Sequence, residues 1–268
     1  MTATVTTTRP DAAGASAGLG MIPGFGGLLR KELTEWRRGR RTWIVFLISA
    51  SFMTLTALNT WLQANLPDDV TDGAPAPILD PLMNLMTGVS SQIFVVAAVF
   101  AVMANVTAER ESGTLAWTAS KPVSRSGIWL SKLVASSAVL WVVAAIIPLA
   151  ATVALVLALY GPLPVVPLVI VAVGMGMAIV LYVAVALAAS AVVTSQAAVA
   201  GIAIGFMFLP QFLGLIVPNM ELLPQSILQW SMMTAAGEET SFVTVVSWLV
   251  TIVALVAFSV RRMERLEL

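Results

Sequence analysis

The chain has 268 residues, of which 59% are hydrophobic and 10% are charged, and its mean hydropathy is +0.93. Soluble domains carry about 25% charged residues, so much of this chain must lie in lipid rather than in water. The sequence contains no cysteine and no histidine, which excludes disulfides, thiol chemistry and histidine-based acid–base or metal sites.

The first 41 residues divide into two parts. Residues 1–20 are rich in Thr, Ala and Gly and lack the basic start and apolar core of a signal peptide, so we expect a disordered cytoplasmic tail. In segment 21–41, Leu29, Leu33 and Trp36 recur at helical spacing opposite charged positions. This pattern predicts an amphipathic helix in the membrane interface, with its Arg residues near anionic headgroups. The alternative is a basic flank that only orients the first membrane span.

Four charge-free runs follow, and a membrane-spanning helix needs about 20 apolar residues. The runs 42–67, 81–108 and 240–260 are each long enough for one span. The run 133–220 has no charged residue over 88 positions and is divided by the turn formers of 160–167 and by the polar residues of 190–196. The predicted spans are about 43–64, 86–107, 133–159, 165–190, 197–217 and 241–260.

The distribution of charge supports six spans with both termini in the cytoplasm. Cytoplasmic loops collect Lys and Arg, and this topology places all 14 basic residues on the cytoplasmic side. The two larger outer loops hold seven of the 14 acidic residues and no base. Four spans within 133–220 would move Arg261, Arg262 and Arg265 outside, so we reject that count. We predict an all-α, six-helix transmembrane domain over 42–260 with a cytoplasmic tail at 261–268.

Motifs for chemistry within the chain are absent. The sequence has no phosphate-binding Gly-x-x-x-x-Gly-Lys-Ser/Thr loop, so we expect no ATP hydrolysis by this chain alone. No ionisable residue lies in the core of a predicted span, which disfavours a proton relay or an ion-coupled pump. We expect no metal site, no catalytic residue and no nucleic-acid partner.

The predicted cytoplasmic loop 108–132 is the most informative segment. It comprises a charged exit from the second span, a short potential helix at 113–120 and a Lys-Pro break. Pro122 disfavours helix at Lys121, and Ser124 can cap the helix that begins the third span. Leu115 and Trp117 need lipid or a partner to cover them, so a docking helix is expected. A plain positively charged loop is the alternative.

This loop resembles the type 2 ABC exporter permeases, in which an acidic-basic-acidic cluster, a Gly-Thr-Leu and a Pro-Val-Ser-Arg lead to a Lys at the next span. The matching residues, with the intervening Trp, are Glu109, Arg110, Glu111, Gly113, Thr114, Leu115, Trp117, Pro122, Val123, Ser124, Arg125 and Lys132. The resemblance implies that the loop is a coupling helix seated on a separate ABC ATP-binding subunit, which would hold ATP and Mg. It also implies an exporter in the plasma membrane of a prokaryote. Residues 116–120 depart from the Leu-rich run of many relatives.

The fifth predicted span offers candidates for a transport path. Gly201 and Gly205 form a small-xxx-small helix-packing pattern. The resemblance implies a permease homodimer or heterodimer in membrane lipid, with a central cavity lined by the second and fifth spans. That arrangement would bring substrate near a set of five residues: Phe94, Asn105, Phe206, Met207 and Gln211. Ordinary packing is the alternative for each of them.

The predicted outer segment 219–240 mixes apolar residues with polar residues and Pro224. In similar permeases this region is a re-entrant helical pair, which needs protein or water around its irregular backbone. The alternative is an amphipathic helix on the outer leaflet. For the whole chain, the alternatives to a permease subunit are a non-transporting scaffold or assembly factor that recruits a cytosolic partner through loop 108–132, and a passive channel.

Overall fold

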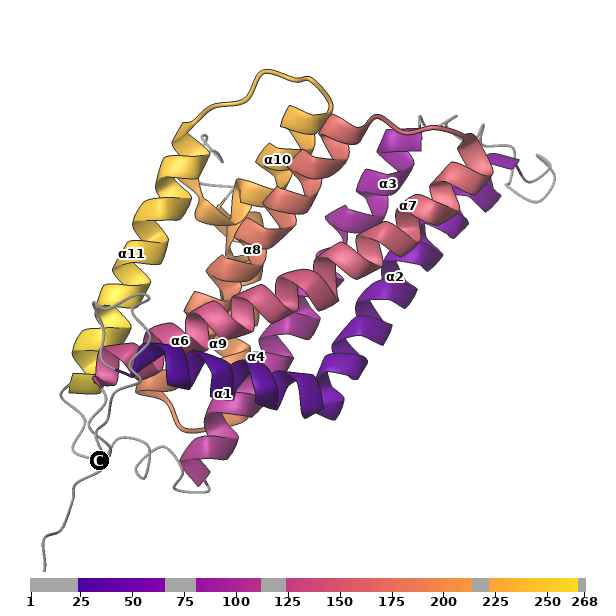
Figure 1. Cartoon of the computed structure of the whole chain (residues 1–268). Helices are drawn as coiled ribbons and strands as arrows, with labels where there is room; N and C mark the ends of the chain where they lie inside the picture. Colours follow the sequence, from indigo (N-terminus) through magenta and orange to yellow (C-terminus); the bar gives the residue numbers. More distant parts are fainter. Residues whose placement is uncertain (1–23, 66–80, 112–123, 214–221, 265–268) are drawn as a thin grey trace, which may run out of the picture.

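The computed structural model describes residues 24–65, 81–111, 124–213 and 222–264, which form helices and connections without a strand (Figure 1). The all-helical fold class is confirmed. The helices described are α1 Phe25–Arg38, α2 Arg40–Asn65, α3 Pro81–Ser90, α4 Ile93–Glu111, α6 Arg125–Leu140, α7 Ile147–Tyr160, α8 Val165–Val192, α9 Gln196–Leu213, α10 Ile227–Ala235 and α11 Val243–Glu264. A π-helical segment, Trp141–Ile146, joins α6 to α7, and a 3-10 turn, Pro224–Ser226, precedes α10.

Five helical segments among the described residues are long and apolar enough to cross a membrane. They are Arg40–Gln63, Pro81–Met103, Ser126–Tyr160, Val165–Val192 and Val243–Arg262. Helix α9 is apolar but shorter within the described ranges. It coincides with the beginning of the predicted span 197–217, whose last residues lie outside the described part of the chain.

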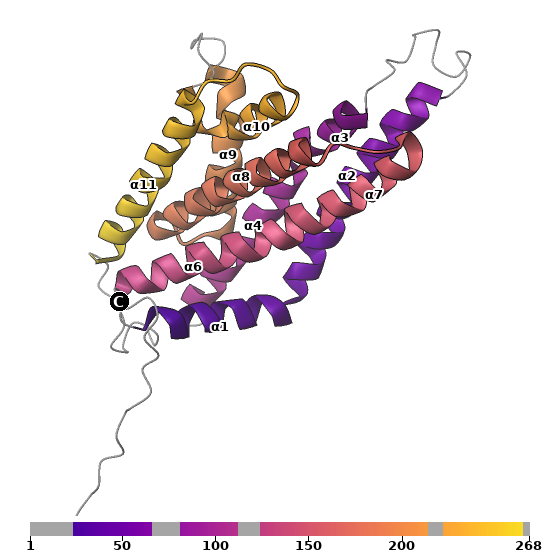
Figure 2. The ribbon, with the colours of Figure 1, turned by 45° about the horizontal axis from the view of Figure 1, so that its top comes forward.

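The long helices run between two ends of the molecule, and α1 lies across one of them (Figures 1 and 2). The start of α2, the end of α4, the start of α6, the connection from α8 to α9 and the end of α11 lie toward the same end as α1. The connections from α7 to α8 and from α10 to α11 lie at the opposite end. Residues far apart in the sequence therefore meet at the α1 end.

Helix α8 is the centre of the bundle and contacts α4, α6, α9, α10 and α11. Its second half, 178–191, is almost entirely buried and rich in alanine. By contrast, α2 and α11 expose large apolar side chains such as Trp43, Leu47, Val246 and Val250. Water does not solvate such surfaces favourably, whereas lipid does. The outer helices thus carry the apolar surface that faces the bilayer.

Two predicted spans depart from a single regular α-helix. Helices α3 and α4 are separated at Ser91 and Gln92, and Gln92 adopts a left-handed φ of 53°, where the sequence analysis expects one helix over 86–107. In the third span, the π-helical segment precedes Pro148. Proline has no N–H to donate to the carbonyl four residues earlier, so a wider turn accommodates this position.

Candidate functional site

The α1 end of the molecule contains the two boundaries of the predicted coupling loop. Helix α4 ends at Glu111 and α6 begins at Arg125, so residues 109–111 belong to the last turn of α4. Ser124 caps α6 as predicted, because its Oγ accepts a hydrogen bond from the Gly127 N–H at 3.0 Å. The helix of the third span thus starts well before residue 133.

Helix α1 packs lengthwise against α6 (Figure 2). It ends at Arg38, and the N–H of the following Gly39 donates to the carbonyls of Glu35 and Trp36. The Thr42 hydroxyl donates to the Trp36 carbonyl from the first turn of α2. These hydrogen bonds fix a sharp turn between α1 and α2. Helix α1 can therefore lie across the bundle while α2 runs along it.

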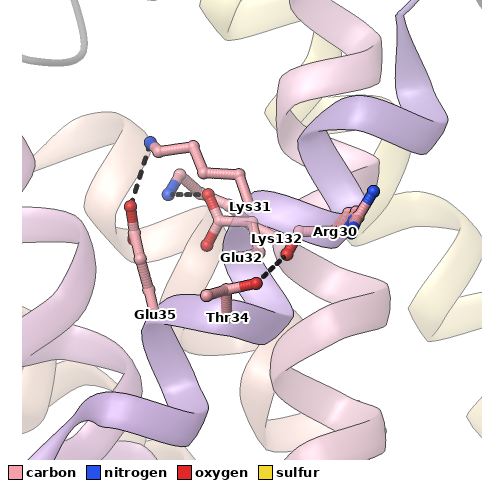
Figure 3. Close-up of polar contacts among 6 residues, drawn as sticks. All are labelled: Arg30, Lys31, Glu32, Thr34, Glu35 and Lys132. Atoms are coloured by element: carbon pink, nitrogen blue, oxygen red, sulfur yellow. Dashed lines mark hydrogen bonds and ion pairs between the residues drawn. The ribbon is translucent and has the colours of Figure 1, made fainter.

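A buried ion pair joins α1 to α6. The Nζ of Lys132 lies 2.8 Å from Oε1 of Glu32, and the two side chains are 2% and 3% exposed, respectively (Figure 3). Burying two charges costs several kcal/mol per ion, which close pairing offsets. Removal of either partner would leave a charge inside the protein. The pair therefore ties α1 to one position along α6.

A second ion pair on α1 provides a contrast. The Lys31 Nζ lies 3.4 Å from Glu35 Oε1, and both side chains are 43% exposed (Figure 3). Exposed pairs of this kind are screened by water and contribute about 0.5 kcal/mol or less. Two acid–base pairs of similar composition thus differ in burial, and only the Glu32–Lys132 pair connects different helices.

The face of α1 that packs against α6 includes a charged residue. Trp36 is buried as expected, but Leu29 is only half-buried and Leu33 is exposed. Glu32, which shares a face with Trp36 at the i, i+4 spacing, is buried in their place. Glu32 thus lies on the face of α1 that packs against α6, where Lys132 is its partner.

Half of the twelve predicted coupling residues lie outside the described part of the structure. Residues 112–123 are not described, and that range includes Gly113, Thr114, Leu115, Trp117, Pro122 and Val123. For Glu109, Arg110, Glu111 and Arg125 the helical backbone is described and the side chain is not. Lys132 is described, and its ammonium group is buried against α1. The structure thus gives Lys132 a contact within the chain. Its partner Glu32 is a candidate that was not among the residues predicted from the sequence.

Within its described part, the structure does not bring the predicted transport-path residues together in one cavity. Phe94 is fully buried in the core of this chain, as the ordinary-packing alternative expects. Phe206 and Met207 are partly buried, and Phe206 meets Tyr182 edge to face with ring centroids 6.0 Å apart. The side chains of Asn105 and Gln211 lie outside the described part.

Gly201 and Gly205 lie on an open face of α9. A Cβ atom added at either position would meet nothing within 4 Å. The close helix packing predicted for these glycines is therefore not made within the described part of this chain. Large apolar residues of α9 are exposed as well, among them Ile202, Phe208 and Phe212.

The outer segment packs into the bundle rather than beside it. Ile227, Leu228 and Ser231 of α10 are buried, and α10 lies against α8. A Cβ atom at Gly174 of α8 would lie only 2.0 Å from Ser231 Oγ. Gly174 follows the start of α8 by nine residues, or about 14 Å at 1.5 Å per residue. Helix α10 thus contacts α8 about 14 Å from the first residue of α8.

Hydrogen bonds tie the same segment to two further helices. The Gln225 side-chain amide donates to the Phe206 carbonyl of α9 at 3.2 Å, and Ser247 of α11 donates to the Leu222 carbonyl at 2.6 Å.

Among the residues that the structure describes, no three His, Cys, Asp or Glu side chains are grouped so as to hold a metal ion.

A helical bundle with five segments able to cross a bilayer, and with apolar outer faces, defines a multi-pass membrane protein. Comparison with known families identifies which kind. The family described as ABC-2 family transporter protein matches residues 27–234, most of the chain. The chain therefore belongs to this family and is an ABC transporter membrane permease, as the resemblance of loop 108–132 predicts. A search of curated proteins found no significant match.

Proposed function

We propose that this chain is the membrane subunit of an ABC exporter, which moves its substrate by alternating access driven by a separate ATP-binding subunit. The observation that carries the proposal is the buried Glu32–Lys132 pair. It joins α1 to the helix that directly follows the coupling loop. A displacement of the loop would therefore move α1 and the third span together.

The proposed topology has six spans with both termini in the cytoplasm, and α1 is an interfacial helix. Helix α9 and the residues after it form the fifth span. The alternation of the long helices between two ends supports this topology (Figure 1). Helix α1 and the end of α11, which carry basic residues, lie at one end, whereas the α10–α11 connection, which contains Glu238 and Glu239, lies at the other. That distribution follows the positive-inside rule.

The proposed coupling runs through residues 109–132. In this proposal residues 113–120 seat in a groove of the ATP-binding subunit, which holds ATP and Mg. The third span is helical from Arg125 to Tyr160 without a non-helical break, which suits it to transmit the loop's movement. Closure of two ATP-binding subunits would then shift the permease between inward-open and outward-open states.

We propose that two permease chains, identical or homologous, form the working unit in the plasma membrane of a prokaryote. The open face of α9 supports this arrangement, since Gly201 and Gly205 leave room for another helix to approach. Phe206, Met207 and Gln211 of the same helix remain candidates for the substrate path. The outer segment is proposed to be re-entrant, supported by the burial of α10 against α8.

The test is purification of the tagged chain from its native membrane with the ATP-binding subunit, followed by reconstitution into liposomes. ATP hydrolysis and ATP-dependent movement of a headgroup-labelled fluorescent phospholipid are measured together. Deletion of 113–120, or Glu109→Lys with Glu111→Lys, should abolish association with the ATP-binding subunit or uncouple hydrolysis from movement.

The matched control reverses the exposed acids at the opposite end, Glu238→Lys with Glu239→Lys, which should change neither quantity. Intact association and transport after the loop deletion would refute the coupling assignment. Stable binding of a cytosolic partner without any ATP-dependent movement would favour the scaffold function instead.

A further inference from the structure

Two cavities meet at Arg41, in the first turn of α2. The first, of about 310 Å³, is a groove between α2 and α4 whose wall includes Arg41, Ile44 and Ile48 from α2 and Ile93, Ala97 and Phe100 from α4. Apart from Arg41, its lining is apolar. The second, of about 440 Å³, lies at the turn between α1 and α2 and is lined by Glu35, Trp36, Gly39, Arg40, Arg41 and Thr42. One compartment is thus apolar and the neighbouring one is polar.

The polar compartment carries an excess of positive charge. Arg40 and Arg41 stand in the first turn of α2, which contains no acidic residue. The N-terminus of a helix is itself positive, so this arrangement is unfavourable without an anion. Glu35, which also lines this compartment, is ion-paired with Lys31. Arginine side chains and helix N-termini both bind phosphate oxygens well.

Trp36 adds a further donor beside the polar compartment. Its side chain is 5% exposed, and its indole N–H has no acceptor among the residues that the structure describes. Buried polar groups normally have a hydrogen-bond partner. Trp36 thus brings a donor without a described acceptor to the α1–α2 turn.

The apolar compartment runs away from this charge into the depth of the membrane. Helix α2 is one of the membrane-spanning segments, and it begins at Arg40. Ile48 lies seven residues beyond Arg41, or about 10 Å along the helix. Ile44 and Ile48 are 55% and 45% exposed, respectively. The groove therefore presents an apolar channel directly below a cationic mouth.

We propose that this site binds one anionic phospholipid, with its phosphate at Arg40 and Arg41 and one acyl chain in the groove between α2 and α4. A soluble anion would leave the groove empty, and an apolar molecule would leave the arginines without a counter-charge. The proposal rests on the chain's being a membrane protein. It is independent of the ATPase coupling proposed above.

The experiment is native mass spectrometry of the full chain released from detergent micelles, titrated separately with phosphatidylglycerol, phosphatidylcholine and inorganic phosphate. One phosphatidylglycerol per chain should be retained, in preference to phosphatidylcholine. Arg41→Gln should weaken its binding by about fivefold or more, the effect of one basic residue near a headgroup, and Arg41→Lys should lose less. Arg262→Gln, in the exposed last turn of α11, is the charge control and should leave binding unchanged.

A second pair of variants tests the groove without altering charge. Ile48→Trp fills the groove and should weaken phosphatidylglycerol binding, whereas Leu47→Trp, at an exposed neighbouring position that does not line the groove, should not. These two variants keep the test decisive if Arg41→Gln fails to insert.

Four results would overturn the proposal. Equal weakening by Arg262→Gln would indicate general surface attraction. Retention of phosphatidylcholine equal to that of phosphatidylglycerol would show that the negative charge of the lipid does not determine binding. Inorganic phosphate that binds as tightly as the lipid, with no effect of Ile48→Trp, would make the polar compartment a phosphate site alone. Occupation of the groove by a second copy would appear as loss of lipid binding in the dimer, and would also refute it.

Discussion

The buried Glu32–Lys132 pair should dominate the attachment of α1 to the bundle. At an effective dielectric constant of 20, unit charges at the observed 2.8 Å separation attract by about 6 kcal/mol. Part of this attraction offsets the free-energy cost of removing both groups from water. Substitution of one partner leaves the other charge buried, which costs about 3–5 kcal/mol. Glu32→Ala and Lys132→Met should each destabilise the docked state of α1 by that amount.

The effect should be local, because α1 is a 14-residue helix at the edge of the bundle and such elements open without global unfolding. Hydrogen exchange of the α1 amides in detergent is therefore the suitable assay. Since 1.36 kcal/mol corresponds to a factor of ten, protection should fall by at least about 100-fold. Protection of α8 should change little.

Two controls separate the buried pair from general charge effects. Glu35→Ala breaks the exposed Lys31–Glu35 pair on the same helix and should change protection by about threefold at most, corresponding to 0.5 kcal/mol or less. The exchange Glu32→Lys with Lys132→Glu should restore much of the loss. Equal effects of Glu32→Ala and Glu35→Ala would refute the reasoning, because burial would then contribute nothing.

Two further substitutions test the opposite end of the molecule. Gly174→Ala should lower stability by about 1–3 kcal/mol, since its Cβ would lie 2.0 Å from Ser231 Oγ. As the control, Gly26→Ala at an open position of α1 should be neutral or stabilise by up to about 1 kcal/mol. Equal melting temperatures of the two variants in detergent would contradict the contact at Gly174. Tyr160→Phe removes the hydroxyl that accepts a 2.7 Å hydrogen bond from the buried Asn84 amide. The free energy of unfolding should fall by about 1–3 kcal/mol, which denaturant titration would detect as a lower midpoint. An unchanged midpoint would contradict this prediction.

The membrane-spanning helices could be predicted because a helix that crosses lipid needs about 20 predominantly apolar residues. Charge-free length and turn formers were sufficient to locate α2, α8 and α11, whose bounds agree with the predicted spans to within a few residues. The break at Ser91 and Gln92 was missed, although the hydroxyl and amide residues there resemble those of 190–196. The run 81–108 is short enough for one span, so its length gave no reason to divide it.

The partner of Lys132 could not be predicted from the sequence. Glu32 and Glu35 both lie on α1, one turn apart, and either could have faced α6. The choice depends on the angle and rotation of α1 relative to α6, which arise from tertiary packing around Trp36. Helical periodicity ranks apolar positions well. It does not identify a charged residue such as Glu32, which is buried because an oppositely charged residue distant in the sequence pairs with it.

The same tertiary packing links the two ends of the bundle through α8. Helix α6, which carries Lys132, leads without a loop to Trp141, whose indole N–H donates to the Ala172 carbonyl of α8 at 2.9 Å. Gly176 makes room for that indole, since a Cβ there would lie 2.8 Å from Nε1. Gly174, two residues away, receives Ser231 of α10. Close contacts at glycine allow little sliding, because interiors are densely packed. Trp141 of the third span and Ser231 of α10 are therefore held at about the same turn of one central helix.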